Sequence, residues 1–291
     1  MYIKKWEYRD GQFEFHKGIN IVYGDNIYDF DTIALFLSSL CENKYHTYIH
    51  SFTDYFSYGH DTEILKCELV YKDKKYNIKP TFQNGDLNIS MMDCQCDYKE
   101  FVDKMDKPTF LYLRSNIRFG CEVIHKYEDY NQYRQMSDGE FYCSFVKNNF
   151  VLEQKFWGNL FMKNLFSPTD YTKYHCEKLC EIINEMILVN NYYGFDFSLK
   201  NGCFVAYNNG APKIVAHIRE KDVGLQIMTI MSLYMMFLVK HDDGYINNIS
   251  EDDGIVLLNL EFGERPSYSD KKWKYYDVFL KYFPNMQFIV L

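Results

Sequence analysis

The chain has 291 residues, of which 47% are apolar and 25% are charged, and it contains only 6 prolines. This composition excludes a disordered or fibrous protein, and the length suits one α/β domain with an inset subdomain. The 40 acidic and 32 basic side chains give a net charge of −8, which argues against a protein whose whole surface wraps nucleic acid. The 9 cysteines are odd in number and scattered, so we expect reduced thiols and a cytoplasmic protein.

The first part of the chain is predicted to alternate short strands with short helices. Apolar residues that alternate indicate strands, and apolar residues that recur every three or four positions indicate helices. In chain order, the expected elements are three strands within 2–23, a helix over 31–40, an antiparallel meander over 63–92, a helix over 98–105 and a strand over 109–113. The stretch 115–170 is aromatic and irregular, and its pattern assigns no element.

The second part is predicted to combine longer helices with further strands. The expected elements are an amphipathic helix over 176–190, short strands over 195–199, 203–207 and 213–217, a helix over 223–239, a strand over 255–258, a helix over 271–282 and a strand over 287–291. The helix over 223–239 is uncharged but contains Gln226 and Ser232, so we expect a buried helix and no membrane span. The run from Ile255 to Leu258 is continuously apolar, which is typical of a parallel strand covered on both faces.

A short loop after the third expected strand carries a family resemblance. The segment from Phe15 to Asn26 resembles the opening of ABC-class ATPases of the RecF/SMC/OLD-like group, in which such a strand leads into the phosphate-binding loop G-x-N-G-x-G-K-S-T. Aligned without gaps, this chain keeps Gly24, Asn26 and Thr32. The resemblance implies that these three residues are remnants of a nucleotide-binding site.

The same alignment removes the chemistry that the loop needs. Phe30 stands where the family has the lysine that contacts the phosphates, and Asp31 stands where it has the hydroxyl that binds magnesium. Asp29 replaces one of the glycines. At about 4 Å and an effective dielectric constant of about 20, each carboxylate facing a phosphate costs roughly 4 kcal/mol. We therefore expect no ATP binding in the family's usual mode.

Two C-terminal segments extend the resemblance. Residues 255–261 resemble the family's Walker B strand, and residues 283–290 resemble its F-P-x-x-Q-F-I-V strand. Asn259 falls at the position of the magnesium-binding aspartate, where a neutral amide is a poor replacement for a carboxylate. A shift by one residue makes Glu261 the catalytic acid but places Leu260 at the magnesium position, so neither alignment supplies both acids.

Taken together, the three segments imply an α/β fold: a P-loop NTPase core like that of ABC-ATPase heads, with an antiparallel β-subdomain and a helical inset. We expect one domain over 1–291, with its core in 1–45 and 215–291 and its inset in 46–214. The function implied is that of a catalytically degenerate ABC/AAA-type ATPase-like protein, a pseudoenzyme that binds a protein partner as a regulatory subunit. The alternative is an ATP-dependent DNA-maintenance or defence ATPase with a rearranged nucleotide site, and only this alternative needs ATP and magnesium.

Four lysines on the expected meander offer a second kind of site. Lys72, Lys74, Lys75 and Lys79 could contact a nucleic-acid backbone. Exposed hairpins also use lysines for solubility and to protect strand edges, and we favour that interpretation.

A zinc site could be assembled from distant residues. Cys94 and Cys96 would have to meet His175, Cys176 and Cys180, but a C-x-C spacing is not a usual zinc motif. Cys176 and Cys180 also fall on the apolar face of the predicted helix over 176–190, so we favour a core role for both thiols.

Overall fold

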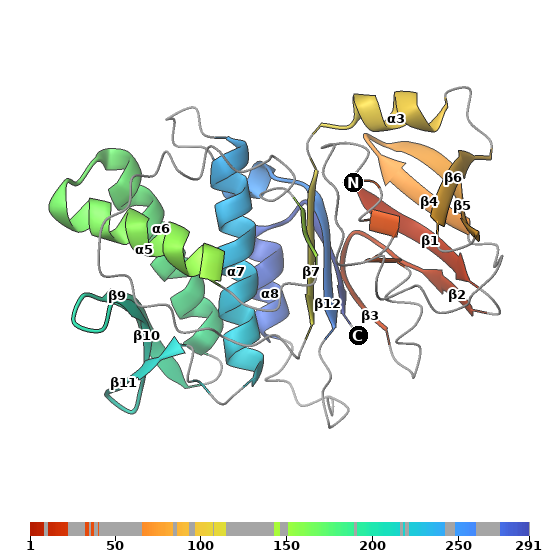
Figure 1. Cartoon of the computed structure of the whole chain (residues 1–291). Helices are drawn as coiled ribbons and strands as arrows, with labels where there is room; N and C mark the ends of the chain where they lie inside the picture. Colours follow the sequence, from red (N-terminus) through yellow and green to blue (C-terminus); the bar gives the residue numbers. More distant parts are fainter. Residues whose placement is uncertain are drawn as a thin grey trace.

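The protein is a mixed α/β structure in which a central sheet lies between a layer of helices and a second sheet (Figure 1). This arrangement agrees with the predicted combination of parallel and antiparallel strands. The computed structural model describes residues 1–8, 11–22, 33–34, 36–37, 40, 66–83, 86–92, 97–106, 108–114, 143–145, 151–188, 191–215, 218, 221–241, 248–259 and 274–290.

The central sheet has the strand order β3-β13-β12-β7-β8, and every neighbouring pair is parallel. Its strands are β3 (Gly18–Ile21), β7 (Thr109–Arg114), β8 (Cys143–Phe145), β12 (Gly254–Asn259) and β13 (Met286–Val290). The predicted strand over 255–258 is confirmed as the middle strand, β12. Ile255 to Leu258 are all buried, because both faces of the sheet are covered.

The second sheet is antiparallel and has the order β2-β1-β4-β5-β6. Its strands are β1 (Tyr2–Tyr8), β2 (Gly11–Glu14), β4 (Lys66–Tyr71), β5 (Lys74–Gln83) and β6 (Asp86–Met91). Lys72 and Asp73 form the two-residue connection between β4 and β5 and have φ angles of 48° and 61°. Positive φ at both positions is the geometry of the tight turns that match strand twist. The meander predicted from alternation is confirmed.

Membership of the two sheets differs from the predicted core and inset boundaries. The strands β1 and β2 lie in 1–45, which was assigned to the core, but they pair in the antiparallel sheet. The strands β7 and β8 lie in 46–214, which was assigned to the inset, but they pair in the central sheet. Alternation within a segment identifies a strand and its buried face, whereas its partner is chosen by contacts with distant segments.

Helices cover the face of the central sheet that lies away from the antiparallel sheet (Figure 1). They are α5 (Val151–Phe166), α6 (Asp170–Leu188), α7 (Lys221–Lys240) and α8 (Lys274–Tyr282); α3 (Tyr98–Lys104) covers β6 instead, and η3 (Ile249–Glu251) is a short 3₁₀ turn. A small third sheet, β9 (Tyr192–Ser198), β10 (Cys203–Asn208) and β11 (Ala211–Ile214), packs on α5 and α6. The predicted helix over 31–40 is also supported, since its described residues Ile33, Ala34, Phe36, Leu37 and Leu40 are helical and buried.

Two helices differ from the sequence prediction. No element was assigned where α5 lies, because Glu153, Gln154 and Asn159 are buried and interrupt its apolar pattern. The helix α6 begins at Asp170 rather than at 176. The hydroxyl of Thr169 accepts a hydrogen bond of 3.1 Å from the backbone N–H of Thr172, which caps this earlier start.

One helix, α7, has the length and apolar composition of a membrane span among the described residues. Its segment Val223–Lys240 is 89% buried by the rest of the protein. This burial agrees with the prediction of a core helix in this region.

A single amide side chain joins the two large sheets. The backbone N–H of Ile3 in β1 donates to Gln287 Oε1 at 2.9 Å, and Gln287 Nε2 donates to the carbonyl oxygen of Ile3 at 2.8 Å. Gln287 Nε2 also donates to the carbonyl of His16 at 3.1 Å. Because Gln287 is 1% exposed, these bonds satisfy a polar group in the core and fix β1 against β13.

Candidate functional site

The carboxyl ends of the central strands define the candidate site. In open α/β sheets, ligands bind outside this edge, where the loops leave the strands. The last register pair between β12 and β7 is Asn259 with Arg114, and the last pair between β13 and β3 is Val290 with Ile21. The sheet therefore aligns the ends of β3, β13, β12 and β7 along one edge.

Of the four residues predicted as remnants of a nucleotide site, the structure describes only Asn259. Gly24, Asn26 and Thr32 lie outside the described residues, so the placement of these three stays a prediction. Asn259 is described as the last residue of β12. One strand, β13, separates β12 from β3, which corresponds to about 10 Å between their axes. Asn259 thus lies on the same sheet edge as the end of the strand that leads to Gly24.

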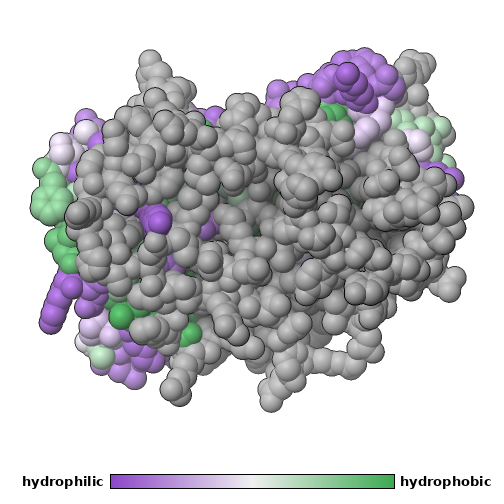
Figure 2. Space-filling model, viewed as in Figure 1, coloured by the Kyte–Doolittle hydropathy of each residue, from purple (hydrophilic) through white to green (hydrophobic). Residues whose placement is uncertain are grey.

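Two of the four hairpin lysines form ion pairs with carboxylates. Lys72 forms an ion pair with Asp106, and Lys75 Nζ lies 3.5 Å from Glu68 Oε1. Lys4 Nζ also lies 3.2 Å from the same Glu68 oxygen. In Figure 2 the surface over α3 is hydrophilic. The ion pairs place positive and negative charges side by side on this part of the protein. Pairs of this exposed kind contribute about 0–1 kcal/mol each, so they indicate solubility more than a built anion site.

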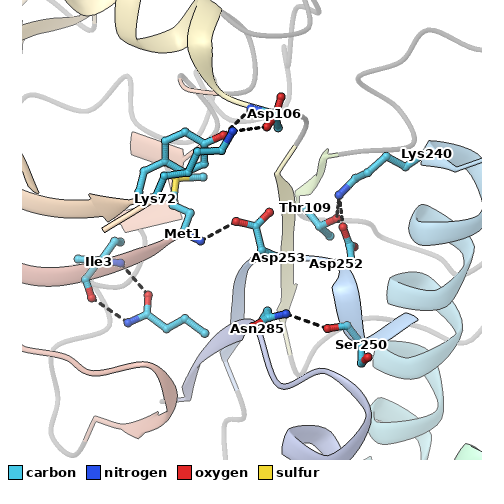
Figure 3. Close-up of polar contacts among 12 residues, drawn as sticks. Met1, Ile3, Lys72, Asp106, Thr109, Lys240, Ser250, Asp252, Asp253 and Asn285 are labelled. Carbon is cyan, nitrogen blue, oxygen red and sulfur yellow. Dashed lines mark hydrogen bonds and ion pairs between the residues drawn. The ribbon is translucent and has the colours of Figure 1, made fainter. Parts of the chain in front are cut away.

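A buried polar cluster lies at the opposite, amino edge of the central sheet (Figure 3). Lys240 at the end of α7 forms an ion pair with Asp252, and the two side chains are 6% and 3% exposed. The Thr109 hydroxyl donates to Asp252 Oδ2 at 2.7 Å and accepts from Lys240 Nζ at 2.9 Å. Each charged group has a partner, so the cluster fastens α7 to the ends of β7 and β12.

The next residue, Asp253, ties the same edge to the antiparallel sheet. Its carboxylate accepts a hydrogen bond of 2.7 Å from the α-amino group of Met1, and its carbonyl accepts one of 2.9 Å from the N–H of Thr109 (Figure 3). Asp252 and Asp253 are adjacent in the chain. This dipeptide therefore connects the helical layer, the central sheet and the antiparallel sheet.

A third polar cluster lies inside the helical layer. His175 Nδ1 lies 2.7 Å from the hydroxyl of Tyr234, the Trp157 indole donates to the carbonyl of Met231 at 2.9 Å, and the Ser232 hydroxyl donates to Glu153 at 3.1 Å. His175 is 0% exposed, and its Nε2 has no hydrogen-bond partner among the described residues. Burial lowers the pKa of His175 to about 4, because a charged imidazole would lose its hydration there.

The zinc interpretation gains no support from this cluster. Cys94 and Cys96 lie outside the described residues, and within the described ranges no three metal-ligating side chains come together. Burial raises the pKa of the Cys176 thiol and raises that of the Cys180 thiol to about 12. Neutral thiols on a packed helix face agree with the core role that we favoured.

We expect His175 to make the protein less stable in acid. Between pH 6.5, its ordinary pKa, and pH 4, the unfolded chain binds a proton at this position that the folded chain does not. The free energy of unfolding should therefore fall as pH falls through this window, by about 3 kcal/mol in total from this group.

Urea unfolding of the wild type and of His175→Asn at pH 7 and pH 4.5 would measure this contribution. Asparagine keeps a polar atom near the position of Nδ1 but does not titrate, so the variant should lose less stability between the two pH values. Equal losses in both proteins would contradict the assignment.

Comparisons with known proteins give structural likenesses but no match by sequence. No protein-family model matches the chain, and none of the curated proteins matches it. Among solved structures, the chain is similar to the SMC head domain from Thermotoga maritima, with a TM-score of 0.45 and 7% sequence identity. The alignment covers 100% of this chain and 89% of that one. Likeness at this level leaves function to be argued from the chain's own residues.

Sequence reasoning missed one residue of the candidate edge, Arg114. Its strand was predicted over 109–113, one residue short of the observed end of β7. The pairing of Arg114 with Asn259 depends on the order of strands in the sheet, and no local pattern encodes that order. The basic residue at the end of an apolar strand was the available signal.

Proposed function

We propose that this chain is a catalytically degenerate ABC-type ATPase-like protein that binds a protein partner as a regulatory subunit. The observation that supports this most is the place of Asn259, at the carboxyl end of the middle strand of a parallel sheet. A magnesium-dependent ATPase would be expected to hold its metal with a carboxylate at such a strand end. In the sequence after β3, Phe30 stands where the family has its phosphate-binding lysine.

The parallel sheet formed by the three resembling segments supports a binding function. The three segments that carry the family resemblance include β3, most of β12, and β13, and these strands are neighbours in one sheet. Segments so distant in sequence form one parallel sheet only when the core packs around them. A folded scaffold without catalytic ligands suits a protein that works through its surfaces.

We propose further that the protein acts in the cytoplasm and uses no metal. The described cysteines Cys67, Cys176, Cys180 and Cys203 are free thiols, as expected in a reducing compartment. We favour a protein partner over a nucleic acid, because Lys72 and Lys75 already pair with carboxylates.

Turnover measurements test the proposal directly. The purified protein should release no phosphate from ATP above background in excess magnesium, and Asn259→Ala should give the same result. Its mass in solution should also be unchanged by ATP and magnesium, since nucleotide would not drive pairing of two copies. Magnesium-dependent hydrolysis that Asn259→Ala abolishes would refute the pseudoenzyme and favour an ATPase with a rearranged site.

A further inference from the structure

Three large apolar side chains are exposed on the outer side of the helical layer. They are Leu165 and Phe166 at the end of α5 and Leu199 directly after β9, and they are 52%, 71% and 53% exposed. These three residues form the apolar strip. Figure 2 shows hydrophobic surface on this side of the helical layer. Contiguous apolar surface on a soluble protein usually marks an interaction site.

The apolar strip continues a buried aromatic cluster to the surface. Phe161 of α5 packs on Phe197 of β9 and Phe204 of β10, with ring centroids 6.2 Å and 5.5 Å apart. Leu165 lies one helical turn after Phe161, on the same face of α5. Leu199 follows Phe197 by two residues, at the start of the turn between β9 and β10. The cluster therefore brings the end of α5 and this turn together at one surface.

Two unpaired charges of opposite sign flank the apolar strip. Asp170 begins α6 four residues after Phe166, and Lys200 follows Leu199. Both side chains are exposed, and neither forms an ion pair with any residue that the structure describes. Lys163 is half-buried in the last turn of α5, where the negative end of the helix dipole offsets its charge. The strip thus has an unpaired carboxylate at one end and an unpaired ammonium group at the other.

This charge arrangement is complementary to itself. In a two-fold interface the same surface faces its own copy, so a rim with charges of one sign would repel itself. A two-fold axis across the apolar strip sets the Phe166 end of one copy against the Leu199 end of the other. Asp170 of each copy then faces Lys200 of the other, at the rim of an apolar contact.

We propose that two copies of this chain pair through the apolar strip in a two-fold symmetric dimer, with Asp170 of each copy beside Lys200 of the other. The inference goes beyond the proposed function, which names neither a second copy nor a surface. Pairing of this kind uses the helical layer and needs neither nucleotide nor metal.

The size of the apolar strip predicts a weak dimer. A large side chain buries at most about 250 Å², so three of them fall short of the about 800 Å² that each partner buries in a standard interface. We therefore expect a dissociation constant of about 10–100 μM, with the charged rim supplying the remaining contact area.

Analytical ultracentrifugation of the full chain from 1 to 300 μM, without nucleotide, tests the proposal. The wild type should change from monomer to dimer over this range. Phe166→Glu should raise the dissociation constant at least tenfold, because the two-fold axis repeats each change on both sides of the interface. Leu188→Glu is the matched control, since Leu188 is 58% exposed but lies at the far end of α6, and it should change nothing.

A charge exchange tests the arrangement of the two copies. Asp170→Lys and Lys200→Asp should each raise the dissociation constant about threefold or more, because each places like charges opposite one another. Both changes in one chain should restore the wild-type value to within twofold. Urea unfolding of each variant checks that the fold is kept, since Asp170 also favours the N-terminus of α6.

Three results would overturn the inference. The first is a wild type that stays monomeric at 300 μM, and the second is a dimer that Phe166→Glu or the charge exchange leaves as it was in each single variant. The third is a monomeric wild type that sediments with phosphatidylcholine–phosphatidylglycerol vesicles while Phe166→Glu does not, which would assign the strip to a lipid surface. None of these results bears on ATP turnover, so the proposed function is tested separately.

Discussion

Replacement of Gly254 by alanine is expected to cost roughly 3–5 kcal/mol of folding free energy, enough to unfold a protein of ordinary stability. Gly254 begins β12 and pairs with Thr109 of β7. A Cβ atom at this position would lie 1.9 Å from the carbonyl oxygen of Thr109 and 2.7 Å from its carbonyl carbon. These are backbone atoms that cannot rotate away, so the neighbouring strands β7 and β12 would have to separate.

Gly210→Ala provides a matched control for this prediction. Gly210 has a φ of 78°, which strains any side chain, but a Cβ there meets nothing within 4 Å. This variant should therefore lose only about 1 kcal/mol. Chemical denaturation of both variants would measure the loss of folding free energy in each. A loss for Gly254→Ala as small as that for Gly210→Ala would show that β7 and β12 can move apart at little cost.

The same region shows what the sequence could predict. The strand from Ile255 to Leu258 was predicted correctly as buried on both faces, because its run of apolar residues has no polar side. The helix α7 was predicted for the same reason. In each case the signal lies within one segment and needs no knowledge of its neighbours.

Features that depend on distant partners were not predictable in this way. In α5, Glu153 is buried and accepts a hydrogen bond from Ser232 of α7, and neither residue indicates the other in the sequence. At the candidate site, Asn259 was identified from a resemblance, whereas Arg114 required the register between β7 and β12. Sequence patterns describe faces of single elements, and a site made of strand ends is set by the order of the strands.

Disruption of the buried ion pair at the amino edge is the second large effect that we expect. Lys240→Met should cost about 3–5 kcal/mol, because it leaves the carboxylate of Asp252 buried with only the Thr109 hydroxyl as a described polar partner. Asp252→Leu should cost a similar amount, since it leaves the ammonium group of Lys240 buried.

The double variant Lys240→Met with Asp252→Leu separates the pair energy from the desolvation cost. With both charges removed, the double variant should be more stable than the sum of the two single losses implies, by at least about 2 kcal/mol. The exposed pair of Lys104 and Glu100 is the control, and its cycle should give no more than about 0.5 kcal/mol. Additive losses at Lys240 and Asp252 would mean that this ion pair does not help to hold α7 against the sheet.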